Sequence, residues 1–194
     1  MDKIICLGKN YAAHAKELKE ELPEKPVLFL KPPSVLIEPK HQSTLKLPWE
    51  RGSIHHELEV VFKLYKKNII AIGIGLDLTL RDLQKELKDK GHPWEKAKVF
   101  KNSAILAPLK TQKDFPNWKE ETFSLFINNE CKQSAKITDA ILEVNETIHY
   151  IDQFFPLSDG DLVFTGTPPG VGPLKPGDHI KMQWGPIHHE FTLQ

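Results

Sequence analysis

The sequence predicts a single α+β domain over residues 1–194, in which a few peripheral helices accompany a mixed, mostly antiparallel sheet. Short apolar segments typical of strands outnumber amphipathic helical segments. The two kinds of segment rarely alternate along the chain, which argues against a doubly wound parallel sheet. The length suits one domain, because a chain of this size buries about 70% of the surface that its unfolded form exposes.

Each predicted strand is a short apolar run bounded by turn residues. The runs cover residues 4–7, 27–30, 57–64, 69–74, 123–128, 161–165, 180–184 and 187–193. Asn128-Asn129 and Gly185-Pro186 are typical of hairpin turns, and the segment 65–68 predicts a direct turn between two strands. The segment 31–53 contains several prolines and is expected to be a long irregular connection.

Three segments are predicted to be helices. Residues 11–21 carry apolar side chains at spacings of three and four. Residues 79–90 form the second, with Thr79 as a candidate N-cap. Residues 138–155 form the third, with one apolar face made by Ile141, Val144, Ile148, Ile151 and Phe155.

The composition argues against several classes of protein. The formal net charge is zero and the pI is about 7.1, so nucleic acid is not an expected partner. There is no run of about 18 apolar residues, so no membrane span is expected. The start of the chain lacks the long apolar segment of a signal peptide, which favours a cytoplasmic location. Cys6 and Cys131 give no disulfide framework.

Two glutamates stand at the start of an otherwise apolar strand, in the segment His56-Glu57-Leu58-Glu59-Val60. Residues i and i+2 of a strand share a face, so Glu57 and Glu59 lie side by side with Cα atoms about 6.6 Å apart. At an effective dielectric constant of about 20, two like charges about 4 Å apart repel by about 4 kcal/mol, so a positive group is expected between them. Asp77, which follows the next apolar strand, is the third candidate acid.

These acids have three interpretations. They are a solvated strand end, a buried pair held by lysines, or the ligands of a divalent cation. An all-oxygen ligand set favours Mg²⁺, Mn²⁺ or Ca²⁺ over Zn²⁺. Zinc ligation by the doublets His55-His56 and His188-His189 is disfavoured, because adjacent residues of a strand point in opposite directions.

Two further patterns also have a structural and a functional interpretation. His14 and Glu17 share a face of the first predicted helix, where a carboxylate beside an imidazole makes a general base, although such residues are more often only solvated. The segment Thr165–Gly172 is rich in Gly, Pro and Thr. It suits a carboxylate ligand through its main-chain N–H groups and hydroxyls, or it is a tight structural connection.

Six blocks, in order along nearly the whole chain, resemble motifs of the fumarylacetoacetate hydrolase family, in particular its short acylpyruvases and oxaloacetate decarboxylases or tautomerases. The blocks are Gly8–Glu17, Pro26–Pro32, His56–Glu59, Leu76–Gln84, Trp94–Lys98 and Thr165–Gly172. They are similar to the motifs G-R-N-Y-x-x-H-x-x-E, P-x-x-F-x-K-P, H-E-x-E, D-x-S/T-A-R-D-x-Q, W-x-x-A/G-K and T-G-T-P-x-G-V-G.

The resemblance implies a β-roll fold, usually in a homodimer, and assigns roles by position. The implied metal ligands are Glu57, Glu59 and Asp77, with Mg²⁺ as the expected ion and Mn²⁺ or Ca²⁺ as alternatives. The implied catalytic residues are the dyad of His14 and Glu17, on a segment that closes over the site, together with Lys98. The implied substrate contacts are Lys9, Asn10, Gln84 and Thr167.

The chain departs from the family pattern at three points. Lys9 replaces an arginine, which weakens bidentate recognition of a carboxylate. Leu80 replaces an alanine beside the metal aspartate. The interval between Glu59 and Asp77 is shorter than in most relatives.

The resemblance implies a Mg²⁺-dependent hydrolase or lyase that acts on a small 2-oxo acid through a metal-stabilised enolate. The expected reactions are C–C hydrolysis of an acylpyruvate or fumarylpyruvate, or decarboxylation of oxaloacetate. One alternative is an isomerase or tautomerase on the same scaffold, acting on oxaloacetate or a 2-hydroxy-dienoate. The other is a non-catalytic, metal-stabilised binding protein.

Overall fold

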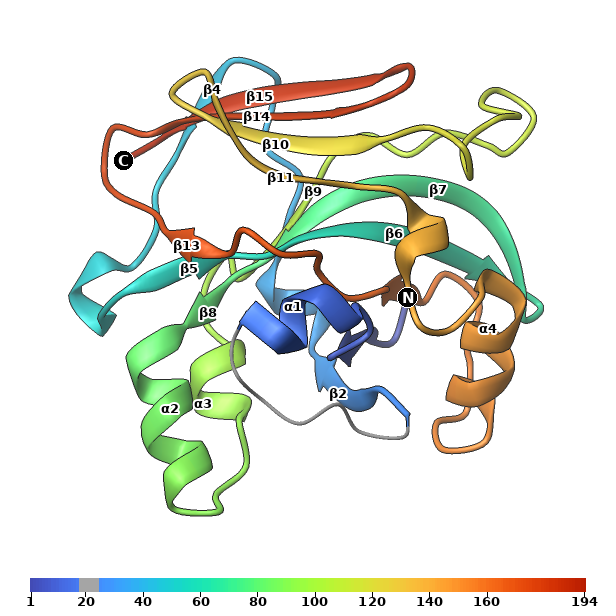
Figure 1. The fold of residues 1–194 in the computed structure, drawn as a ribbon, viewed down its shortest axis with the longest axis horizontal. Helices are drawn as coiled ribbons and strands as arrows, with labels where there is room; N and C mark the ends of the chain where they lie inside the picture. Colours follow the sequence, from blue (N-terminus) through green and yellow to red (C-terminus); the bar gives the residue numbers. More distant parts are fainter. Residues whose placement is uncertain (18–24) are drawn as a thin grey trace.

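The computed structural model describes residues 1–17 and 25–194, without the side chains of residues 14–16, as a mixed α+β fold made mostly of strands. A five-stranded sheet packs over a seven-stranded sheet, and the helices lie on the side of the molecule away from the five-stranded sheet (Figure 1). Most strand pairs are antiparallel. The predicted fold class is confirmed.

The seven-stranded sheet has the order β2-β1-β12-β6-β7-β9-β3. Its strands are β1 (Ile4–Gly8), β2 (Val27–Lys31), β3 (Leu36–Ile37), β6 (Leu58–Tyr65), β7 (Asn68–Asp77), β9 (Ala104–Leu106) and β12 (Leu162–Phe164). The central pair, β6 and β7, is joined by a two-residue turn in which Lys66 and Lys67 have φ of 46° and 61°. The direct turn predicted at 65–68 is confirmed.

The five-stranded sheet has the order β11-β10-β14-β15-β4, and a small third sheet has the order β13-β5-β8. Their strands are β4 (Ser43–Leu45), β5 (Ile54–His56), β8 (Thr79–Leu80), β10 (Phe123–Ile127), β11 (Glu130–Ala135), β13 (Gly172–Pro173), β14 (His179–Trp184) and β15 (Ile187–Leu193). Both predicted hairpins, closed by Asn128-Asn129 and Gly185-Pro186, are present. The segment 31–53 is less irregular than expected, because it contains β3 and β4.

The helices are short. They are α1 (Ala12–Glu17), α2 (Arg81–Asp89), α3 (Glu95–Lys98) and α4 (Val144–Asp152), with single 3-10 turns at Pro33–Val35, Trp49–Arg51 and Ile137–Asp139. Residues 18–21 of the first predicted helix lie outside the described residues. No helix in the described part of the chain is long and apolar enough to cross a membrane.

Two helix predictions are corrected. The helix expected over 138–155 covers only Val144–Asp152, because the main-chain N–H groups of Ile141 and Leu142 donate instead to the main-chain and side-chain oxygens of Asn10, at 2.7 and 3.0 Å. Thr79 is not an N-cap. It lies in β8, and its hydroxyl donates to Glu57 Oε1 at 3.1 Å.

The apolar core lies on both faces of the seven-stranded sheet. Along β6, Val60, Phe62 and Leu64 pack toward the five-stranded sheet, whereas Val61 packs into a second cluster on the opposite face. Trp184 anchors the first cluster through edge-on contacts with neighbouring rings, among them Phe115 at 5.0 Å between centroids. Burial on both faces explains why the strands of this sheet are nearly continuous apolar runs.

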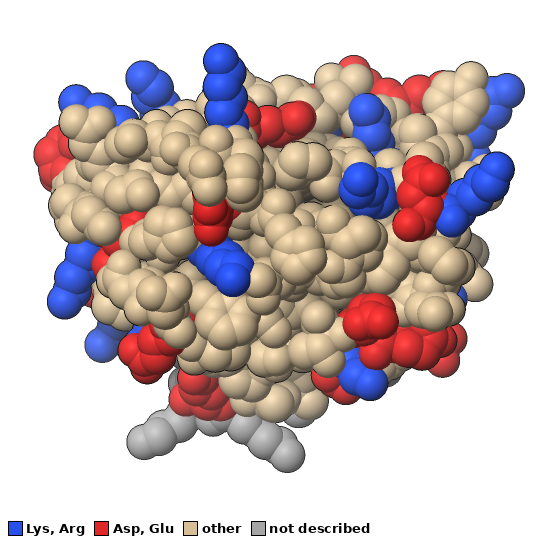
Figure 2. All heavy atoms as spheres, turned by 90° about the horizontal axis from the view of Figure 1, so that it is seen from above, with Lys and Arg blue, Asp and Glu red and all other residues tan. Residues whose placement is uncertain are grey.

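Charges of both signs are interspersed on the face of the molecule seen from above in Figure 2, mostly around its periphery. A broad uncharged area occupies the middle of this face. No single-sign field covers it, in agreement with the zero net charge of the chain.

Asp161 ties the N-terminus to β12. Its carboxylate accepts hydrogen bonds from the main-chain N–H groups of Asp2, Lys3 and Ser158 and from Lys3 Nζ, at 2.8–3.1 Å. Burial alone would raise the pKa of Asp161, but the hydrogen bonds, that of the Lys3 side chain first, outweigh it and lower the pKa. The charged form is therefore the one that stabilises the fold.

We expect Asp161→Asn to lower the free energy of unfolding at pH 7 by about 2 kcal/mol, because buried N–H donors lose a charged acceptor. The difference in unfolding free energy between the wild type and the variant is complete above the unfolded pKa of about 3.9, and it is lost as the pH falls through the lower folded pKa. Urea unfolding of both proteins, at pH 7 and in acid, measures this difference. Asp152→Asn, which removes an exposed ion pair with Lys67, is the control and should change stability by less than about 1 kcal/mol. A stability difference between the wild type and Asp161→Asn that grows in acid would contradict a stabilising role for the charged Asp161 carboxylate.

Candidate active site

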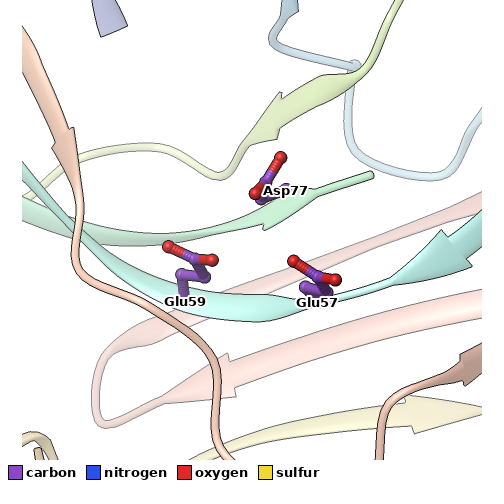
Figure 3. Close-up of side chains that lie close together, drawn as sticks. All are labelled: Glu57, Glu59 and Asp77. Carbon is purple, nitrogen blue, oxygen red and sulfur yellow. The ribbon is translucent and has the colours of Figure 1, made fainter. Parts of the chain in front are cut away.

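Three carboxylates meet where β5, β6 and β7 come together. Glu57 lies between β5 and β6, Glu59 is two residues further on, and Asp77 ends β7. The register pairs Leu58 with Leu76, and the N–H of Asp77 donates to the main-chain oxygen of Glu57 at 2.9 Å. One oxygen of each carboxylate lies within 4.8 Å of the others, and Figure 3 shows the three groups turned toward a common space.

Burial makes this cluster costly without compensating positive charge. Glu57, Glu59 and Asp77 are 6%, 2% and 1% exposed. Burial, followed by the negative charges of Asp77 and Glu57, raises the pKa of Glu59 well above its ordinary value. The N–H of Gly166 opposes this shift by donating to Glu59 Oε2 at 2.7 Å.

Three cations surround the carboxylates. Lys98 Nζ donates to Glu57 Oε2 at 2.8 Å and to Asp77 Oδ2 at 2.7 Å. Arg81 forms an ion pair with Glu57, and its other terminal nitrogen donates to Gln84 Oε1. Lys31, which is 1% exposed, places Nζ 2.5 Å from Asp77 Oδ1 and donates to the main-chain oxygens of Leu78 and Ser103.

The carboxylates around Lys98 favour its charged form. Burial by itself would lower its pKa, but the charges of Asp77 and Glu57, and its hydrogen bonds to them, outweigh burial and raise the pKa. An ammonium has three N–H donors and Lys98 gives two to these carboxylates, which leaves one for a ligand.

The carboxylates border a small cavity of about 40 Å³ that opens to solvent. Among the described residues it is lined by Leu7, Gly8, Lys9, Phe29, Glu57, Glu59, Asp77, Arg81, Gln84, Lys88, Trp94, Lys98 and Thr167. The carboxylates supply only oxygen ligands, and a divalent cation would offset their repulsion, so the residues present fit a hard ion such as Mg²⁺ or Mn²⁺.

The structure brings most of the predicted site residues to this cavity. Lys9, Gln84, Lys98 and Thr167 line it together with the three acids. Asn10 does not. Its side chain is buried, donates to the Thr165 main-chain oxygen at 2.8 Å and accepts from Leu142 N–H at 3.0 Å, so it holds the main chain behind the site.

The predicted dyad lies on α1. Glu17 is exposed, and the N–H of Gly170 donates to both its carboxylate oxygens, at 3.1 and 3.2 Å. This contact joins α1 to the Thr165–Gly172 loop. The side chain of His14 lies outside the described residues, so the dyad stays a prediction.

Three charged residues of the site, Lys31, Arg81 and Lys88, were not singled out from the sequence. Lys31 and Arg81 both lie within blocks that resemble family motifs, but neither was assigned a role. A lysine that ends the apolar strand Val27–Lys31 was the available signal for a buried ion pair. Arg81 gave no such signal, because it begins a polar helix whose outer face is solvated.

Comparison with known proteins gives a consistent set of relatives. The family model described as fumarylacetoacetate (FAA) hydrolase C-terminal matches residues 3–189. The chain is 40% identical over 192 residues to the Escherichia coli (strain K12) protein named oxaloacetate tautomerase YcgM, covering 93% of this chain and 87% of that protein. It is 35% identical over 189 residues to the Mus musculus protein named oxaloacetate tautomerase FAHD1, mitochondrial, covering 92% and 85%.

A solved structure, that of fumarylpyruvate hydrolase from Pseudomonas aeruginosa in complex with Mn²⁺ and pyruvate, superposes with a TM-score of 0.92 at 31% identity. The match covers 100% of this chain and 89% of that one. The family match over nearly the whole chain, the relatives above 30% identity and the shared fold lead to one conclusion. The chain belongs to the fumarylacetoacetate hydrolase family.

Proposed function

We propose that this protein is a divalent-metal-dependent enzyme that interconverts the keto and enol forms of a small 2-oxo acid, with oxaloacetate as the substrate. The observation that carries the proposal is the cluster of Glu57, Glu59 and Asp77 on a cavity of about 40 Å³. Two relatives named oxaloacetate tautomerase, at 40% and 35% identity, support the same substrate.

The three acids are the proposed ligands of the ion, which we propose to be Mg²⁺, with Mn²⁺ as a substitute. A bound divalent cation acts as a Lewis acid that polarises the 2-oxo group and makes the adjacent carbon more acidic. The Mn²⁺ in the Pseudomonas aeruginosa fumarylpyruvate hydrolase supports a divalent ion in this family.

The charges of the site fit an anionic substrate. Four cations, Lys9, Arg81, Lys88 and Lys98, line the cavity with the three carboxylates, and Lys31 is buried beside Asp77. A bound divalent cation would add to this excess of positive charge. Arg81 is the proposed carboxylate partner, because its side chain is partly exposed and borders the cavity.

Proton transfer is the chemistry that the chain itself supplies. In tautomerisation a base removes a proton from the carbon next to the ketone, and an acid delivers a proton to the ketone oxygen. We assign the base to His14, with Glu17 orienting it, and assign stabilisation of the developing negative charge to the remaining N–H of Lys98.

C–C hydrolysis of a fumarylpyruvate or acylpyruvate is the second candidate. It is favoured by the likeness to the Pseudomonas aeruginosa fumarylpyruvate hydrolase. Both reactions need an activated 2-oxo group, but hydrolysis adds water to a second carbonyl and releases two products. Product analysis therefore separates the two functions.

We expect the protein with Mg²⁺ to accelerate enol–keto exchange of oxaloacetate, because the site polarises the ketone and supplies a base. NMR of oxaloacetate, fumarylpyruvate and a short acylpyruvate, each with and without EDTA, measures the reaction. Cleavage of an acylpyruvate without faster exchange of oxaloacetate would favour the second candidate. No reaction with any of the three would refute both.

Replacing one acid should weaken the ion's site. We expect Glu59→Gln to lower Mn²⁺ affinity by about 100-fold, because it removes a charged ligand while keeping the acceptor for Gly166 N–H. Isothermal titration calorimetry measures the change. Glu86→Gln, at an exposed carboxylate paired with Lys90, is the matched control and should bind Mn²⁺ like the wild type. Equal Mn²⁺ affinity in the two variants would show that Glu59 is not a ligand of the ion.

The proposed base can be separated from the metal site. We expect His14→Ala to lower kcat by about 10²–10⁴-fold, because it removes the base but no ligand of the ion. Its Mn²⁺ affinity should match that of the wild type. His149→Ala, at an exposed histidine of α4, is the control and should keep full activity. A fully active His14→Ala protein would assign the base to another residue.

A further inference from the structure

Gln133 is a buried amide that does not line the cavity but contacts the main chain on two sides of it. It lies on β11, at the edge of the five-stranded sheet, and is 1% exposed, although the next residue, Ser134, is exposed. The register pairs Gln133 with Leu125 and Cys131 with Phe126, which leaves one extra residue in β11 between them. A bulge of this kind redirects a side chain, here into the interior.

The partners of Gln133 fix the orientation of its amide. The main-chain N–H of Leu58 can only donate, and it lies 2.9 Å from Oε1. The main-chain oxygen of Pro168 can only accept, and it lies 2.9 Å from Nε2. The amide oxygen therefore faces the strand that carries the acids, and the NH₂ group faces the Thr165–Gly172 loop.

This orientation assigns the protons of two neighbours. His56 Nδ1 lies 2.9 Å from the same Oε1, so Nδ1 carries a proton and donates it. Thr167 Oγ1 accepts from Gln133 Nε2 at 2.8 Å and donates its own proton to the Leu58 main-chain oxygen at 2.9 Å. The Thr167 hydroxyl thus has no proton left for a ligand and can only accept from one, which differs from the donor role that its sequence motif suggested.

The oxygen and the NH₂ group of the Gln133 amide therefore contact different parts of the site. Glu57 lies between His56 and Leu58, and both of these donate to the Gln133 oxygen. Thr167, which lines the cavity, and Pro168 both accept from the Gln133 NH₂ group. One side chain thereby contacts both the acidic strand and the loop, which are also bonded to each other directly, through Gly166 N–H to Glu59 and the Thr167 hydroxyl to Leu58.

We propose that Gln133 is a positioning residue of the active site, an inference that rests on the function proposed above. Its oxygen holds the His56 side chain and the Leu58 main chain, one on each side of Glu57, and its NH₂ group holds the Thr167 hydroxyl in the acceptor state. Gln133 touches neither ion nor substrate, and it acts through Glu57 and Thr167.

Two substitutions distinguish the contribution of the Gln133 oxygen from that of its NH₂ group. Gln133→Glu keeps the oxygen facing Leu58 and His56 but loses both donors to the loop, so the Mn²⁺-loaded protein should bind malate, whose hydroxyl can donate to Thr167, about tenfold more weakly without loss of Mn²⁺ affinity. Gln133→Leu loses the hydrogen bonds of both the oxygen and the NH₂ group, so the affinities for Mn²⁺ and for malate should both fall about tenfold. Ser134→Ala, on the same strand, is the control and should change neither. Wild-type affinities in both Gln133 variants would overturn the proposal.

A double-mutant cycle distinguishes positioning from a general loss of stability. If Gln133 acts on the substrate through the Thr167 hydroxyl, Gln133→Glu should lower malate affinity by less than about twofold in a Thr167→Val background. Additive effects of the two substitutions would contradict the proposal. Thermal unfolding of each variant identifies any that does not fold.

A measurement on the wild type keeps the proposal testable if a variant does not fold. The ring ¹H–¹⁵N correlations of His56 should show the proton on Nδ1, and a proton on Nε2 alone would refute the assigned hydrogen-bond directions. These binding and NMR measurements involve no turnover. A protein that binds Mn²⁺ and malate but leaves oxaloacetate unchanged would therefore refute the proposed function and still test Gln133.

Discussion

The repulsion among three buried carboxylates is the constraint on which the rest of the site depends. Two unit charges about 4 Å apart repel by about 4 kcal/mol at an effective dielectric constant of about 20, and Glu57, Glu59 and Asp77 form three such pairs. The pairing of β6 with β7 forces them together. Lys31, Arg81, Lys98 and the Gly166 N–H surround them as compensation.

The division of the molecule into two sheets explains how this cluster is held. The seven-stranded sheet carries the acids and Lys31, and its two buried faces make it a rigid platform. The five-stranded sheet contributes no carboxylate to the cluster. Through Gln133 on β11 it contacts both the acidic strand and the Thr165–Gly172 loop, which are also bonded to each other directly.

Local pattern predicted much of this arrangement. The two-residue period of a strand placed Glu57 beside Glu59, and the apolar runs gave the main strands of the large sheet to within a few residues. The same reasoning overestimated the helix at 138–155, because an apolar stripe at helical spacing says nothing about the distant Asn10 that holds residues 141 and 142 in a non-helical path. Thr79 was misplaced for a similar reason, since its hydroxyl binds Glu57 and caps no helix.

The compensating groups were harder to predict than the acids. Lys31 and Asp77 are distant in sequence, and Gln133 contacts Leu58 from 75 residues away, so no local period relates them. Nothing in the composition separates these side chains from other lysines and glutamines of the chain. They could be identified only after the sheets were assembled.

Anomalous diffraction from crystals soaked in Mn²⁺ tests the central claim most directly. The account predicts a single strong anomalous peak between the side-chain oxygens of Glu57, Glu59 and Asp77, with the Lys98 ammonium still within reach of a ligand in the cavity. Saturating Mn²⁺ that leaves no peak there, while the three carboxylates keep only their lysine and arginine partners, would contradict it.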